Sequence, residues 1–155
     1  SIRRQRQMCI RDRQFVAQRL APLNAGKTMA QVADRLVPSM VAPNALPAGA
    51  TLKDFPPGLA LAHACMAAVP PNTYRASLQA LVTFEQRAAL PSISVPTLCL
   101  AGEHDKTAPP EVLRRMAQKI PGAQFECIPG VGHLMGFEQE TPFHQAVLNF
   151  VRNHF

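Results

Sequence analysis

The chain has 155 residues, 47% hydrophobic and 17% charged, which is enough for one domain with a buried core. No apolar run approaches the roughly 20 residues that a membrane-spanning helix needs, so the composition excludes a disordered chain and we expect no membrane partner. The net charge of +6 is typical of a nucleic-acid partner only where the basic residues gather on a folded surface.

Most of the positive charge lies in residues 1–13, which hold five of the 16 Lys and Arg residues and one of the 10 acidic ones. Residues 3–12 resemble a translated adapter from a sequencing library. We therefore predict that 1–13 is a non-native segment, excluded from fold reasoning, and that the natural chain was cut near Gln14. No nucleic-acid partner is expected. The other cysteines, Cys65, Cys99 and Cys127, form no C-x-x-C pair, so we expect reduced thiols and a cytoplasmic protein.

Residues 14–90 are predicted to be helical, without a strand. Apolar residues recur at helical spacing from Met29 to Val37, and Thr28 is the expected N-cap of that helix. The proline-rich stretch 38–57 predicts loop and short helical turns. Two further helices are expected at about 58–69 and 72–88, the second with Leu78 and Leu81 on its buried face.

Residues 91–155 show a different order of elements. Short apolar runs at 97–101 and 124–128 predict buried strands, and helices are expected from Pro110 and from Thr141 to the end. This β-α-β-α order predicts two parallel strands joined by a right-handed crossover. Because parallel sheets are covered on both faces and have more members, we expect a larger sheet of which these strands are part.

An aspartate and a histidine each follow one of these strands. Asp105 comes after Gly102, which we expect to let the backbone turn sharply, and His133 lies between Gly132 and Leu134. Parallel sheets place their chemistry at the carboxyl ends of strands, and an Asp that orients a His is two-thirds of a nucleophilic triad. The alternatives are a turn aspartate and a loop histidine without function.

These segments resemble the α/β-hydrolase family. Residues 95–105 (VPTLCLAGEHD) are similar to its penultimate strand and acid loop, and residues 128–134 (IPGVGHL) to its last strand and histidine loop. Glu138 and Phe143 match the family's lead into the terminal helix, although Glu140 stands where a proline is usual. The resemblance predicts a C-terminal fragment of an α/β-hydrolase, with 14–90 as a helical cap and 91–155 as part of the core.

The resemblance implies that Asp105 is the catalytic acid and His133 the general base. The nucleophile of the family lies in a G-x-S-x-G elbow, which this sequence lacks. It implies a cofactor-independent hydrolase of small-molecule esters or lactones, with the 3-oxoadipate enol-lactonases as the most similar group. Alternatives are C–C hydrolase, epoxide hydrolase, dehalogenase or haloperoxidase activity, or a catalytically inactive truncated fragment. No metal or cofactor is expected, and His63 on the cap is either a buried helix residue or a substrate contact.

Overall fold

The computed structural model describes residues 14–155, so the predicted non-native segment lies outside the described residues. The described chain divides into two compact units. Residues 14–33 and 63–85 form the first, and residues 34–62 and 86–155 form the second. Two of the helices begin in one unit and end in the other. The assignment of 14–90 to a cap and 91–155 to a core stays a prediction.

The first unit is helical. Residues 14–24 form a helix, followed by the N-terminal part of α2 (Met29–Met40), the C-terminal part of α3 (Pro57–Ala67) and α4 (Pro71–Thr83). Thr28 caps α2 as expected, because its Oγ1 accepts from the main-chain N–H of Gln31 at 3.2 Å while Gln31 Oε1 accepts from the N–H of Thr28 at 3.1 Å. Leu78 of α4 is buried as predicted, whereas Leu81 is exposed.

Helix α2 ends later than the sequence predicts, since it continues through Pro38 to Met40. A proline in the last turn removes only one main-chain donor, and the helix tolerates this loss near its end. Helix α4 ends earlier than expected, at Thr83. The hydroxyl of Thr83 shares its proton between the carbonyls of Gln79 and Ala80, each 3.1 Å away.

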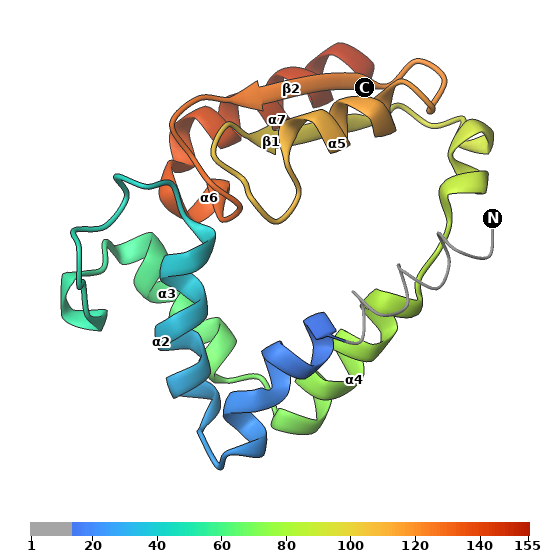
Figure 1. Cartoon of the computed structure of the whole chain (residues 1–155). Helices are drawn as coiled ribbons and strands as arrows, with labels where there is room; N and C mark the ends of the chain where they lie inside the picture. The colour runs from blue at the N-terminus through green and yellow to red at the C-terminus, as the bar shows by residue number, and fades with distance from the viewer. Residues whose placement is uncertain (1–13) are drawn as a thin grey trace. The chain divides into compact units, whose positions relative to one another are not determined.

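The second unit contains the strands (Figure 1). In chain order its elements are the C-terminal part of α2, η1 (Leu52–Asp54), the start of α3, η2 (Arg87–Ser92), β1 (Leu98–Gly102), α5 (Pro110–Ala117), β2 (Gln124–Ile128), α6 (Met135–Glu138) and α7 (Glu140–His154). Within the described residues β1 and β2 form a two-stranded parallel sheet, as predicted. Helix α6 is not predicted by the sequence. Helix α7 begins at Glu140, one residue before the predicted start at Thr141.

Helices α5 and α7 both pack on the strands, and in Figure 1 α5 lies in front of them and α7 behind. Cys99 of β1, Ala117 of α5 and Ile120 form a buried cluster. Leu113, Met116 and Phe125 are partly buried against it. Burial of these apolar side chains on the sheet stabilises the β-α-β unit.

Candidate active site

The two strands end at the same edge of the sheet, where Gly102 of β1 lies opposite Ile128 of β2. The pairing continues into the loops beyond the strands. The main-chain N–H of Glu103 donates to the carbonyl of Ile128 at 2.9 Å, and that of His104 donates to the carbonyl of Val131 at 2.8 Å. The loop that carries Asp105 is therefore joined to the loop that carries His133.

Gly102 is required for a reason other than the expected sharp turn. It is the last residue of β1 and does not have a positive φ. A Cβ there would collide with the carbonyl oxygen of Gly132 and lie 2.8 Å from that of Val131. The glycine thus permits the close approach of two backbones.

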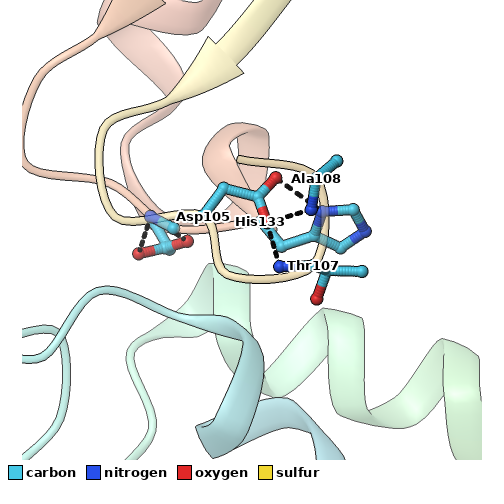
Figure 2. Close-up of polar contacts among 6 residues, drawn as sticks. Asp105, Thr107, Ala108 and His133 are labelled. Atoms are coloured by element: carbon cyan, nitrogen blue, oxygen red, sulfur yellow. Dashed lines mark hydrogen bonds and ion pairs between the residues drawn. The ribbon is translucent and has the colours of Figure 1, made fainter. Parts of the chain in front are cut away.

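Asp105 and His133 are in direct contact, as the sequence order suggested. Asp105 Oδ2 lies 2.8 Å from His133 Nδ1. The Asp105 side chain is 3% exposed and that of His133 is 34% exposed. Figure 2 shows the carboxylate joined to the imidazole and to the main chain of Thr107 and Ala108, whose N–H groups donate to Oδ1 at 2.7 and 2.9 Å.

The two oxygens of Asp105 do different things. Oδ1 accepts from two N–H groups of its own loop, as a turn aspartate does. Oδ2 contacts the imidazole. Because a carboxylate only accepts hydrogen bonds, we assign the proton of the neutral ring of His133 to Nδ1. That tautomer leaves Nε2 with its lone pair, as a general base requires.

Glu138 also belongs to this site, although the sequence pattern predicts no contact between it and the histidine loop. Its Oε1 and Oε2 accept from the N–H of Gly132 at 2.9 and 3.0 Å, and Oε2 also accepts from the N–H of Ala42 at 2.8 Å. Its position in the lead into the terminal helix is the one signal in the sequence that points to it, and that pattern does not indicate which main-chain groups it contacts.

The other predicted candidates do not join this contact. His63 is buried and belongs to the first unit, so its contact with substrate stays a prediction. Burial raises the pKa of the thiols of Cys99 and Cys127, and a raised pKa disfavours the thiolate that a nucleophile needs. In residues 14–155 no three His, Cys, Asp or Glu side chains are grouped to hold a metal ion, and no helix there is long and apolar enough to cross a membrane.

Comparison with known families gives a match across most of the chain. A family model of the alpha/beta hydrolase fold matches residues 18–140. A curated relative, the putative carbamate hydrolase RutD of a Caulobacter species, is 36% identical over 83 residues, which are 52% of this chain and 30% of that protein.

Solved structures agree with this fold. A thermophilic esterase from Thermogutta terrifontis superposes with a TM-score of 0.73 at 26% identity, over 96% of this chain and 52% of that one. The enol-lactonase from Burkholderia xenovorans shares the fold, with a TM-score of 0.74 at 24% identity, over 88% of this chain and 49% of that one. The chain thus spans about half the length of these structures and less than a third of the curated relative.

Proposed function

Because the chain belongs to the α/β-hydrolase fold family, we propose that Asp105 and His133 are the acid and base of a triad that hydrolyses carboxylic esters or lactones. The observation that carries this proposal is the 2.8 Å contact between Asp105 Oδ2 and His133 Nδ1. It joins the loops that follow two neighbouring parallel strands, where α/β folds place their chemistry.

In this reaction His133 Nε2 takes the proton of a nucleophile hydroxyl as its oxygen attacks the ester carbonyl. The ring then gives that proton to the alcohol oxygen of the substrate as the carbonyl–oxygen bond breaks, which leaves an acyl-enzyme. A water molecule, deprotonated by the same nitrogen, attacks the acyl carbon. The ring returns this proton to the nucleophile oxygen as the acyl–oxygen bond breaks, which releases the carboxylic acid and restores the free enzyme. Asp105 keeps the Nδ1 proton in place and stabilises the imidazolium that forms twice in the cycle.

We place the nucleophile outside the printed sequence. The serines are Ser1, Ser39, Ser77, Ser92 and Ser94, and none has glycine both two residues before and two residues after it, as a nucleophile elbow requires. The solved esterase is about twice the length of the part that this chain matches, which supports the proposal. The printed chain by itself is then inactive, and the activity belongs to a longer protein.

The substrate class is a small molecule with an activated carbonyl. The esterase at 26% identity and the putative carbamate hydrolase at 36% identity are named for carbonyl groups bonded to a heteroatom leaving group. Lactones fit the same chemistry because they are internal esters. Fold alone does not choose among the hydrolytic reactions of such a scaffold, so the nature of the nucleophile decides between an ester and an alternative such as an epoxide or a haloalkane.

The decisive experiment extends the source DNA upstream of the codon for Gln14. A G-x-S-x-G codon run in the same frame supports the proposal, and the extended protein should then hydrolyse an aryl ester. Its His133→Ala variant should lose that activity. An aspartate at the elbow would replace the ester proposal with dehalogenase or epoxide-hydrolase chemistry. Hydrolysis by the 155-residue chain alone, abolished by His133→Ala, would contradict the placement of the nucleophile outside it.

A further inference from the structure

We propose that Glu138 is a positioning residue, which fixes the Val131–Gly132 peptide and so keeps the imidazole of His133 within hydrogen-bond distance of Asp105. The inference rests on the proposed role of His133 as general base. Glu138 ends α6, which follows His133 closely in the chain. Its carboxylate contacts the main chain of two separate segments.

The first segment is the histidine loop. Gly132, which accepts no side chain at its position, donates its N–H to both oxygens of Glu138 at 2.9 and 3.0 Å. The peptide between Val131 and Gly132 is therefore held by Glu138, and it directly precedes the peptide that joins Gly132 to His133. A change in the orientation of Gly132 moves the attachment point of the imidazole directly.

The second segment is the turn after α2. The N–H of Ala42 donates to Glu138 Oε2 at 2.8 Å, and two residues earlier the carbonyl of Met40 accepts from the N–H of His133 at 2.7 Å. The carboxylate and the Met40 carbonyl thus fasten the same short stretch of the histidine loop to the same turn. Both Ala42 and Gly132 are buried. Without the carboxylate their N–H groups would therefore have no acceptor, because water does not reach them.

Other contacts hold the earlier part of this loop independently. Glu103 Oε2 accepts from the N–H of Gly130 at 2.8 Å, and the carbonyl of Val131 accepts from His104. Removing Glu138 should therefore leave residues 128–131 in place and release the loop from Gly132 onward. The predicted effect is local to His133, which separates positioning from a general loss of fold.

The test is proton NMR of the 155-residue protein labelled with ¹⁵N-histidine, which reads the Nδ1–H of His133 without needing a substrate. The resonance is assigned by its absence in His133→Gln. In Glu138→Ala we expect the signal to vanish or to exchange with solvent at least about tenfold faster, because a proton held in a weakened hydrogen bond is exposed more often. Glu140→Ala, which removes the same charge from an exposed position in the first turn of α7, should keep it unchanged.

Glu138→Gln provides a partial rescue. One amide oxygen in the place of Oε2 can accept from both Ala42 and Gly132, while the NH₂ in the place of Oε1 cannot accept. Exchange in this variant should fall between wild type and Glu138→Ala. If Glu138→Ala does not fold by circular dichroism, Glu138→Gln decides: faster exchange than in Glu140→Ala supports positioning, and an equal rate overturns it. A folded Glu138→Ala with the wild-type signal overturns it as well.

In the extended enzyme the same variants separate this inference from the proposed function. Misplacing a catalytic group by about 1 Å costs roughly 100-fold in rate, so Glu138→Ala should lower kcat strongly and leave KM nearly unchanged. Should wild type hydrolyse no ester while the NMR signal still depends on Glu138, the proposed function fails and the positioning survives. An active Glu138→Ala enzyme with wild-type kcat would refute the positioning alone.

Discussion

The main-chain N–H of His133 donates a hydrogen bond to the carbonyl oxygen of Met40, 2.7 Å away. The contact joins the loop after β2 to the end of α2, two segments of the second unit that are far apart in the sequence. It also gives a partner to one of the last carbonyls of α2, which a helix end leaves unpaired. The backbone of His133 is thus held from the α2 side and its ring from the Asp105 side.

Gly132→Ala should destabilise the second unit. A Cβ at this position would lie 2.6 Å from the carbonyl oxygen of Met40 and from the carbonyl carbon of Val41, and 2.8 Å from the nitrogen of Ala42. Because all three neighbours are backbone atoms that cannot rotate away, we expect the free energy of unfolding to fall by about 3 kcal/mol. Urea unfolding followed by circular dichroism measures it.

Gly122→Ala is the matched control for that substitution. Nothing lies within 4 Å of a Cβ at Gly122, but its φ is +71°, so the cost is limited to the left-handed conformation, about 1 kcal/mol. Equal stability of Gly132→Ala and wild type would contradict the close packing of the histidine loop on the turn after α2.

The local elements of the second unit could be predicted because each depends on a short pattern. The second strand begins and ends at the predicted residues, and β1 is shifted by one residue, since continuous apolar runs bounded by polar residues and turns mark buried strands. The order of Asp105 and His133 after their strands indicated that the side chains would lie near each other, because parallel strands end at a common edge. Their contact confirms that proximity.

The rest depends on contacts between distant segments, which no local pattern encodes. Nothing near Glu138 indicates that its carboxylate accepts from Ala42, and the requirement for glycine at 102 comes from the carbonyls of the other loop. The exposure of Leu81, which was predicted to lie on the buried face of its helix, has the same cause. Helical periodicity identifies an apolar face but not the neighbour that covers it.

Asp105→Asn should remove catalysis in the extended enzyme while leaving the loop folded. The Asn carbonyl oxygen can still accept from Thr107 and Ala108, as Oδ1 does now, but its NH₂ would face Nδ1 of His133. The ring would then carry its proton on Nε2, where it cannot accept the proton of the nucleophile. We expect kcat to fall by about 10⁴-fold.

Steady-state kinetics with an aryl ester measures that loss, and Thr107→Ala is its control. This variant keeps the main-chain donor to Asp105 and changes only an exposed side chain, so its kcat should match wild type. Full activity in Asp105→Asn would show that the contact between Asp105 and His133 has only a structural role.

Cys99 and Cys127 should react slowly with iodoacetamide at pH 8, whereas the exposed Cys65 should react first. Burial raises the pKa of both thiols above the ordinary 9.0, and the carboxylate of Glu103 raises that of Cys127 further. A raised pKa means less thiolate at pH 8, so their modification should still accelerate with pH beyond 9.0, the ordinary pKa of the thiol. Peptide mapping by mass spectrometry reads each site, and urea should equalise the three rates. Equal rates in the native protein would contradict the burial of Cys99 and the partial burial of Cys127.

The carboxyl of Asp54 should titrate below its ordinary pKa of 3.8, because the main-chain N–H of Thr51 and the Thr51 hydroxyl both donate to it. A folded pKa below the unfolded one means that the contact stabilises η1 above about pH 4 and that this contribution is lost as the pH falls through the folded pKa. Thr51→Ala removes the hydroxyl donor and should move the NMR titration midpoint of Asp54 upward. Thr51→Ser keeps a hydroxyl and should leave the midpoint near that of wild type. A midpoint in Thr51→Ala equal to that of Thr51→Ser would mean that the main-chain donor alone holds the carboxylate.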